Sequence, residues 1–361
     1  MTDEGIRSRP LPNCVLCGRE GEMFYEHITD PLYEAPGSWN LKRCPNLDCG
    51  LIWLDPMPEI EDIGKAYKSC YYTHSEVVPR RSVFRTIYAA IKNGYLRAGL
   101  GYTKGVGPAW YVVLSPLALL HISGVSGVQS DVMYLRADPG AKLLDIGVGD
   151  AAMLARFAEL GWDVEGIDVD QIAVDAATAK GLNVKLGDLF SQAYPDDSFD
   201  CVTMRHVQEH VPQPVELLRE CRRILKPGGM LVSVVPNAES WEHRRFKDRW
   251  VALEPPRHLW LFGPKSLARL CELSGLEVVR LFSSGQAAWA SWVRNMMLRP
   301  ERFWAGWAPR KLGGLLWHVA LRTRMWVDRW SGQEIVLMAQ KPIFSSQKGG
   351  RAEVPKADGC Q

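Results

Sequence analysis

The sequence has no large excess of charge of either sign and no long uninterrupted apolar segment. Its 43 lysines and arginines are balanced by 41 acidic residues, so the net charge of +2 gives no broad attraction to nucleic acid, and we expect no nucleic-acid partner. An apolar stretch over residues 109–122 is interrupted by Pro116 and is too short to span a bilayer, which predicts a buried or interfacial helix. The first residues carry acids and no apolar run, so we expect no secretory signal and a cytoplasmic setting.

Four of the nine cysteines are clustered near the N-terminus. Cys14 and Cys17 form one short loop, Cys44 and Cys49 form a second, and each loop is followed by a glycine that lets the backbone turn. In a reducing compartment, clustered cysteines bind metal more often than they form disulfides, and four thiolates suit a closed tetrahedral zinc site. The alternative, four reduced thiols in a small core, would leave so short a segment without another source of stability. We therefore predict structural zinc at these four cysteines.

The pattern of the sequence divides the chain into four regions. It predicts a zinc-ribbon-like module for residues 1–58, a helical connector for 59–138, a larger α/β region for 139–342 and a flexible polar tail for 343–361. In the larger region, short apolar runs alternate with helical patterns, which predicts a mostly parallel sheet with helices on both faces. The predicted strands cover residues 142–147, 163–169, 183–188, 199–204, 230–236, 276–284 and 334–342, and the predicted helices cover 151–161, 171–181, 214–229 and 266–275.

A segment rich in tryptophan and arginine, about residues 286–330, separates the last two predicted strands. One interpretation is a lid over an acceptor, or a membrane-surface element whose interfacial aromatic side chains make a peripheral membrane contact. The simpler interpretation is a pair of packed helices, and it is the one that we favour. Neither interpretation decides the chemistry.

Acids and glycines follow three successive predicted strands. Asp145, Gly147 and Gly149 lie in a turn between a strand and a helix, where backbone can approach a ligand at the carboxyl end of the strand. Asp168 follows the second strand, where it can accept hydrogen bonds from ribose hydroxyls, and Asp188 follows the third. Any one of these acids could simply cap a turn, but that explanation does not suit all of them together. The pattern therefore predicts a nucleotide-type pocket.

Several segments occur in the order typical of one enzyme family. LLDIGVGDAAML, EGIDVDQIAVDAA, LGDLFSQAYPDDSFDCVTMRHVQEHV and ILKPGGMLV make roughly residues 130 to 342 resemble the class I methyltransferases that depend on S-adenosylmethionine (SAM). This resemblance implies a Rossmann-like sheet, mostly parallel with one reversed strand. It also implies a set of cofactor-binding residues: Asp145, Gly147 and Gly149 at the methionine and ribose portion, Asp168 with Val169 at the ribose, and Asp188 with the Leu189 backbone at the adenine. A nicotinamide-dependent dehydrogenase is the nearest alternative, since it also needs glycines and an acid after its first two strands.

A short histidine motif also matches a zinc-peptidase pattern. His206 and His210 fit H-x-x-E-H, in which both histidines must lie on adjacent turns of one helix. Pro212 and Pro214 follow at once and would stop such a helix, so we disfavour the peptidase interpretation. By resemblance to the methyltransferases, Arg205, His206 and His210 would instead face the cofactor or the acceptor.

The cysteine-bearing module also resembles the N-terminal zinc-binding segment of some bacterial methyltransferases, including sugar C-methyltransferases. Those enzymes pair an acid with a histidine as the base, but here Arg257 precedes His258. His258 is our first candidate for the catalytic base and His206 the second, because histidine titrates near neutral pH. Each histidine could equally be bonded to backbone in a loop.

Taken together, the sequence predicts a methyltransferase that uses SAM, with zinc in a structural role. The expected acceptor is a small molecule, plausibly a sugar or a lipid-linked precursor. Two alternatives stay open: an RNA methyltransferase that uses the zinc module for recognition, and a non-catalytic zinc-ribbon adaptor. The sequence leaves open whether oxygen, nitrogen or carbon is methylated and whether the chain forms oligomers.

Overall fold

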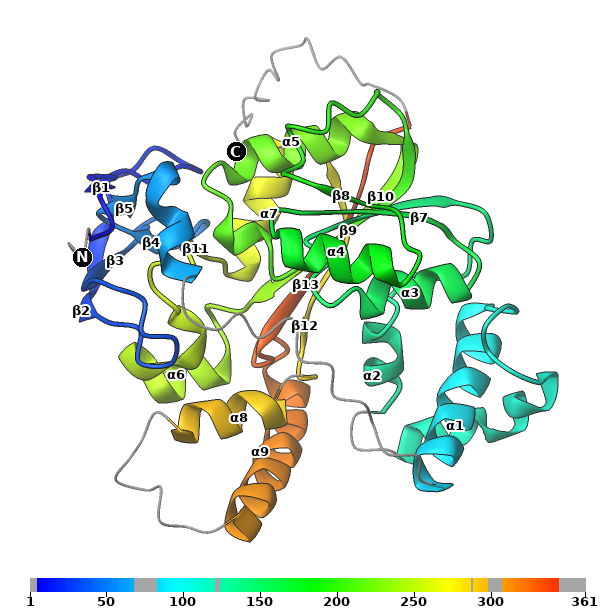
Figure 1. The fold of residues 1–361 in the computed structure, drawn as a ribbon. Coiled ribbons are helices and arrows are strands. Elements are labelled where there is room, and N and C mark those ends of the chain that lie inside the picture. Colours follow the sequence, from blue (N-terminus) through cyan, green and yellow to red (C-terminus); the bar gives the residue numbers. More distant parts are fainter. Residues whose placement is uncertain (1–4, 68–82, 121–123, 287, 298–306, 344–361) are drawn as a thin grey trace, which may run out of the picture.

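The computed structural model describes residues 5–67, 83–120, 124–286, 288–297 and 307–343 (Figure 1). The predicted tail lies outside the described residues except for Ile343. No helix in the described part of the chain combines the length and apolar character needed to cross a membrane.

A seven-stranded sheet lies at the centre of the molecule. Its strands are Lys142–Ile146 (β6), Asp163–Asp168 (β7), Val184–Leu186 (β8), Phe199–Arg205 (β9), Leu225–Pro236 (β10), Glu277–Ser284 (β12) and Glu334–Gln340 (β13). Their order is β12-β13-β10-β9-β6-β7-β8, and β13 is antiparallel to both of its neighbours. The other pairings of the sheet are parallel. The prediction of a mostly parallel α/β sheet with one reversed strand is confirmed, and it argues against the dehydrogenase alternative.

Helices cover both faces of this sheet because alternate strand residues are apolar on both sides. The covering helices are Ala152–Glu159 (α3), Gln171–Ala179 (α4), Pro214–Ile224 (α5) and Pro264–Leu273 (α7). Leu143 belongs to an apolar cluster with residues of α3 and α4, whereas its neighbour Leu144 belongs to a cluster with residues of α5 and α7. The two clusters form the core on opposite sides of the sheet.

The predicted helix over 214–229 was wrong at its C-terminal end. Helix α5 ends at Ile224, and β10 begins at Leu225. Pro227 has no backbone N–H to donate within a helix, and Gly228 adopts a positive φ of 80° that a continuing helix does not allow.

The N-terminal region, here called the head (residues 5–58), contains two small sheets. The strands are Ser8–Arg9 (β1), Glu22–Ile28 (β2), Trp39–Arg43 (β3), Ile52–Leu54 (β4) and Met57–Pro58 (β5), and Trp260–Leu261 (β11) joins them. β1 pairs with β5, and the larger sheet has the order β11-β4-β3-β2. Because β11 belongs to the larger region and pairs Trp260 with Trp53 of the head, the head packs against the larger region as one structure.

Helices complete the connector and the insertion. They are Val83–Leu100 (α1), Gly124–Ser130 (α2), Trp241–Phe246 (α6), Ala288–Met297 (α8), Trp307–Val327 (α9) and the 3-10 helices Ile60–Tyr67 (η1), Ala109–Leu120 (η3), Gln208–His210 (η4), Lys247–Arg249 (η5) and Val251–Leu253 (η6). The described part of the insertion contains two helices, α8 and α9, in contact with each other, as the simpler interpretation predicts. The apolar stretch forms η3, which is largely exposed.

Candidate active site

The carboxyl ends of the parallel strands border a cavity of about 2050 Å³. Strand β6 leads into the glycine turn, β7 ends at Asp168 and β9 ends at Arg205, so three strands deliver polar groups to one edge of the sheet. Of the residues predicted for cofactor or acceptor, the cavity is lined by Gly147, Gly149, Asp168, Val169, Asp188, Leu189, Arg205, His206, His210 and His258. The structure thus brings together residues that are up to a third of the chain apart.

The glycine turn requires its glycines. Gly147 has a φ of +76°, and a Cβ at this position would lie 2.5 Å from Cγ2 of Val207. Gly149 has a φ of +56°, and its backbone N–H donates to Oδ2 of Asp168 at 2.9 Å. The turn therefore keeps backbone at the cavity wall and links the ends of β6 and β7.

Asp168 and Asp188 both accept hydrogen bonds from nearby backbone. Oδ1 of Asp168 accepts from the N–H of Asp170 at 2.9 Å, and Oδ1 of Asp188 accepts from the N–H of Ser191 at 2.8 Å. These bonds fix the direction of each carboxylate, and each oxygen keeps a second lone pair for a ligand.

An exposed apolar wall adjoins these acids. The side chains of Val169, Ile172 and Phe190 are 75%, 61% and 43% exposed, and all three line the cavity. Exposed apolar side chains of this kind can pack against the two faces of a flat aromatic ring. Sequence reasoning missed Ile172 and Phe190, although both lie within a few residues of Asp168 and Asp188.

Two buried groups near the glycine turn have unused bonding capacity. Asp145 is 1% exposed, and its Oδ1 accepts from the Thr203 hydroxyl at 2.7 Å. Burial raises the pKa of Asp145 to about 7, although this hydrogen bond acts to lower it. Arg205 donates through one terminal nitrogen to the Ser130 carbonyl at 2.6 Å. Among the described residues, neither Oδ2 of Asp145 nor Nε of Arg205 has a hydrogen-bond partner. A carboxylate oxygen without a partner suits an ammonium group, and a guanidinium nitrogen without a partner suits a carboxylate, so the two together suit an amino-acid moiety.

His206 lies between two carboxylates. Its Nδ1 is 3.2 Å from Oε1 of Glu209, and its Nε2 is 3.1 Å from Oε1 of Glu334. Burial alone would lower the pKa of His206, but the hydrogen bonds and charges of the two glutamates outweigh it and raise the pKa to about 10. At neutral pH this environment favours an imidazolium, which donates protons and does not accept one. The 3-10 helix η4 ends at His210, so the helix that a zinc-peptidase motif needs is not formed here.

His210 and His258 lie side by side, with ring centroids 4.7 Å apart. Nδ1 of His258 donates to the Ala252 carbonyl at 2.8 Å, and Nδ1 of His210 lies 3.0 Å from the Arg257 carbonyl and 3.1 Å from the Tyr67 hydroxyl. Burial lowers the pKa of both, that of His210 to about 4, so both rings are neutral at pH 7. Because the carbonyls fix Nδ1 as the protonated nitrogen, Nε2 keeps its lone pair.

Arg257 lines the cavity, and its guanidinium pairs with the head. Its guanidinium lies 2.8 Å from Oδ2 of Asp30, with both side chains buried, and 4.1 Å from the ring centre of Tyr33. The acid nearest to His258 is instead Glu254, whose Oε2 lies 3.8 Å from Nε2 of His258. Arg257, which stands where an acid was expected, therefore binds the head. The carboxyl group near His258 comes instead from Glu254, four residues earlier in the chain.

A polar end of the cavity also escaped sequence reasoning. Glu242 is 1% exposed, and its Oε2 accepts from the Ser291 hydroxyl and, at 3.3 Å, from the Trp250 indole. Gln333, 4% exposed, lines the same cavity. These residues come from α6, α8 and the segment before β13, and no local sequence signal relates them.

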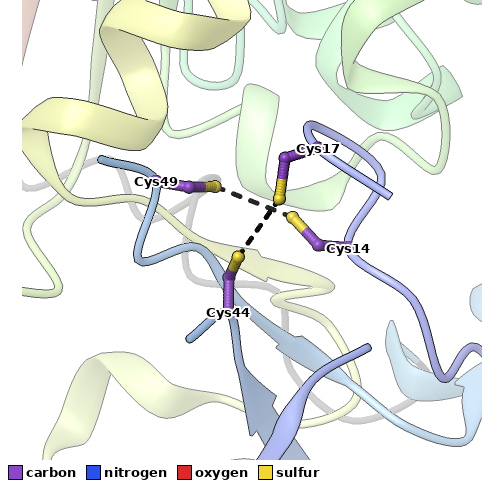
Figure 2. A group of neighbouring side chains, drawn as sticks. All are labelled: Cys14, Cys17, Cys44 and Cys49. Atoms are coloured by element: carbon purple, nitrogen blue, oxygen red, sulfur yellow. Dashed lines mark hydrogen bonds between the residues drawn. The ribbon is translucent and has the colours of Figure 1, made fainter. Parts of the chain in front are cut away.

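The four cysteines of the head converge, as Figure 2 shows. Sγ of Cys14 lies 3.7 Å from Sγ of Cys49, and Sγ of Cys17 lies 3.3 Å from Sγ of Cys44. Tetrahedral zinc with Zn–S bonds of about 2.3 Å needs sulfur atoms about 3.8 Å apart, so the observed separations suit such an ion. A second group, Glu209, His210 and His258, also brings its ligand atoms within 4.8 Å of one another.

Comparisons relate the chain to known proteins. Residues 127–281 match the family model described as a methyltransferase domain. A ubiquinone biosynthesis O-methyltransferase of Xanthomonas oryzae is 35% identical over 130 residues, which cover 34% of this chain and 54% of that protein. The chain thus spans about half the length of that relative. A demethylmenaquinone methyltransferase of Lysinibacillus sphaericus is 30% identical over 192 residues, which cover 45% of this chain and 82% of that protein.

Among solved structures, a SAM-dependent methyltransferase from Archaeoglobus fulgidus is similar with a TM-score of 0.41 and 18% identity. The similarity covers 65% of this chain and 100% of that chain.

Proposed function

Because this chain belongs to the class I SAM-dependent methyltransferases, we propose that it transfers the methyl group of SAM to a small-molecule acceptor, a sugar or a lipid-linked precursor. The observation that carries the proposal is the convergence of the glycine turn, Asp168 and Asp188 on one cavity at the carboxyl edge of the sheet. That cavity extends beyond these residues to His258 and Glu242, which leaves room for a second molecule beside the cofactor.

The cofactor-binding residues divide the proposed ligand among them. Asp145 and Arg205, with their unused polar atoms, would hold the amino-acid portion, and Gly147 and Gly149 would let backbone approach it. Asp168 would accept from the ribose hydroxyls. The adenine would lie between Val169 and Phe190 and face Asp188, the Leu189 backbone and Ile172. When bound, SAM supplies a methyl group that is open to attack by a nucleophile.

His258 would act as the base on the acceptor. His258 lines the cavity and its neutral Nε2 can take a proton, while its Nδ1–H bond to the Ala252 carbonyl holds the ring in place. The Glu254 carboxyl group, 3.8 Å from Nε2, would stabilise the imidazolium that forms. His206 is the weaker candidate, because its two glutamates keep it protonated; we assign it, with His210, to orienting the acceptor.

Zinc at Cys14, Cys17, Cys44 and Cys49 would be structural. The four sulfur atoms surround one point and would complete a tetrahedral site with no position left for a reactant. The cluster lies in the head, and none of the four cysteines lines the cavity.

Calorimetric titration with SAM, and separately with NADH, would test the proposal, together with metal analysis of the same sample. Micromolar SAM binding and one zinc ion per chain are expected. Absence of SAM binding would support the non-catalytic adaptor, and a preference for NADH over SAM would support a dehydrogenase. A second bound ion would indicate that Glu209, His210 and His258 hold metal, and would remove His258 as the base.

Asp168→Ala is the variant that tests the cofactor position. Loss of the ribose contacts should weaken SAM binding at least about tenfold, since a hydrogen bond to a charged group contributes about 1.5–3 kcal/mol. Asp175→Ala is the matched control: Asp175 lies on the neighbouring helix α4, bonded to Gln171, and does not line the cavity. Equal SAM affinity in Asp168→Ala and wild-type protein would contradict the placement.

A further inference from the structure

Helix α9 carries a row of exposed apolar side chains, here called the outer stripe: Leu315, Leu316, Val319, Trp326 and Val327. Their exposed fractions are 45%, 60%, 46%, 89% and 92%. At 100° per residue these five positions fall within one third of the helix circumference, so they form one continuous strip. Five large apolar residues on one helix face exceed the scattered exposure that is normal on a soluble surface.

The opposite face of α9 is fixed by packing. Trp317 is 8% exposed and stacks between Trp241, at a centroid distance of 4.1 Å, and Trp292, at 4.8 Å. Leu321, one turn further along, is fully buried. Because the opposite face of α9 already packs against this molecule, the outer stripe is not the face through which α9 contacts the core.

The segment of sequence that contains the outer stripe is predominantly basic. Residues 286–328 contain seven arginines and lysines and two acids, Glu301 and Asp328. The whole chain, by contrast, has nearly equal numbers of basic and acidic residues. A helix with tryptophan, leucine and arginine and no acid of its own has the composition of an interfacial membrane helix.

A second exposed apolar element lies on the same side of the sheet. On η3, Trp110 is 61% exposed, Val113 is 78% and Leu117 is 42%. This element packs against α1, and Figure 1 shows both α1 and α9 below the central sheet. Residues of α1, which contacts η3, and of α8, which contacts α9, line the cavity.

We propose that the outer stripe, assisted by η3, docks this protein on an anionic bilayer surface, with the cavity facing the lipid. The apolar side chains would enter the boundary between headgroups and acyl chains, and basic side chains of this segment would contact anionic headgroups. Membrane docking does not depend on the proposed methyl transfer, but it would bring a lipid-linked acceptor to the cavity.

Vesicle sedimentation with the full-length protein tests this proposal. The probes are phosphatidylcholine vesicles with and without phosphatidylglycerol, at low and at high salt. Binding is expected to the anionic vesicles and to weaken with salt, because the electrostatic part is screened. The double substitution Leu316→Glu and Val319→Glu should reduce the bound fraction at least about tenfold, since it removes apolar contacts and adds negative charge.

Val279→Glu is the matched control. Val279 is 53% exposed and lies on the edge strand β12, so Val279→Glu repeats the Val319→Glu change, taken as a single variant, at similar exposure outside the stripe. SAM affinity and thermal unfolding of each variant would establish that it is folded, which separates failure of docking from failure of the proposed function. No binding to anionic vesicles, or equal loss in the Val279 control, would overturn the proposal. The proposal would also be overturned if the lipid-free protein formed a dimer that Val319→Glu dissociates, because the stripe would then bind a second copy of the chain.

Discussion

The two candidate bases, His206 and His258, line the same cavity but have neighbours that favour opposite protonation states. Glu209 and Glu334 each contact one nitrogen of His206 and favour its charged form. His258 is buried, and burial lowers its pKa and favours its neutral form although its Nδ1 donates to the Ala252 carbonyl. Because a base must be neutral before it reacts, the structure distinguishes two residues that the sequence alone ranks only weakly.

The pH dependence of turnover should report on His258. Burial lowers the pKa of His258, so the acid limb of the rate profile should lie below the ordinary histidine value of about 6.5. His258→Ala should lower turnover about 10²- to 10⁴-fold and remove that limb, while SAM affinity stays near the wild-type value. Turnover with SAM and any accepted substrate, measured across pH, provides the check. An acid limb near pH 10, or one that persists in His258→Ala, would point to His206 or to another base.

At the residue scale, the sequence could predict groups whose role depends on position along a strand. Asp145, Asp168 and Asp188 each follow a recognisable apolar run; Asp168 and Asp188 line the cavity, whereas Asp145 is buried within β6 and is not among the lining residues. Glu242 and Gln333 could not be found in this way, because they meet only when α6 and the segment before β13 pack together. Position in the chain fixes the first kind of residue, and tertiary packing fixes the second.

Between elements, β2 of the head and α6 of the larger region meet at a buried histidine. Nε2 of His243 lies 3.1 Å from the Tyr25 hydroxyl, and its Nδ1 lies 2.6 Å from the Ala238 carbonyl. The ring stacks on Trp250 at 4.6 Å and is 4% exposed. Burial lowers the pKa of His243 to about 4, so this contact between head and larger region uses a neutral imidazole.

That contact should weaken in acid. The unfolded chain takes up a proton near pH 6.5 and the folded chain only near pH 4, so the contribution of His243 is complete above 6.5 and is lost as the pH falls towards 4. The full loss is of the order of 3 kcal/mol. His243→Gln should reduce the slope of unfolding free energy against pH in this window by about 1.4 kcal/mol per pH unit. Urea unfolding at several pH values measures the slope.

Tyr25→Phe provides the comparison for this test. It removes the hydroxyl group but keeps the titrating ring, so it should lower stability at every pH and leave most of the slope. Equal slopes in wild-type protein and His243→Gln would mean that His243 is protonated at the same pH in the folded and in the unfolded state.

Element predictions succeeded where an apolar run had the length of one strand and failed where two elements share a run. The strands β6, β7 and β9 follow their predicted ranges closely. The boundary between α5 and β10 was misplaced because no polar loop separates them. β11 was not predicted at all, since a strand of two residues has no periodicity, and its pairing with β4 is a long-range contact.

On the scale of the whole molecule, the head and the larger region contribute to one cavity. Tyr33 of the head and Tyr67 of η1 line it together with His210 and His258. The buried pair of Asp30 and Arg257 joins the head to the loop that carries His258. The proposed cofactor side is built differently, from the ends of β6, β7, β8 and β9 of the larger region. The molecule therefore has a cofactor half that is independent of the head and an acceptor half that depends on it.

Removal of the proposed zinc should separate these halves. Cys44→Ser removes one of the four thiolates, and we expect loss of zinc and a fall in stability of more than about 4 kcal/mol, since the small head has little core of its own. SAM affinity should stay within a few-fold of wild type. Hydrogen exchange should rise in residues 5–58 and in the loop of Arg257 and His258, but not in β6, β7 and β8.

Cys271→Ser is the matched control, because Cys271 is fully buried on α7 and lies outside the cysteine cluster. It should keep its zinc and the wild-type pattern of exchange in the head. If Cys44→Ser retained its zinc, the cluster would not be the metal site. If it lost zinc and SAM binding together, the cofactor half would also depend on the head, and the strand-end residues would not suffice to form the SAM site.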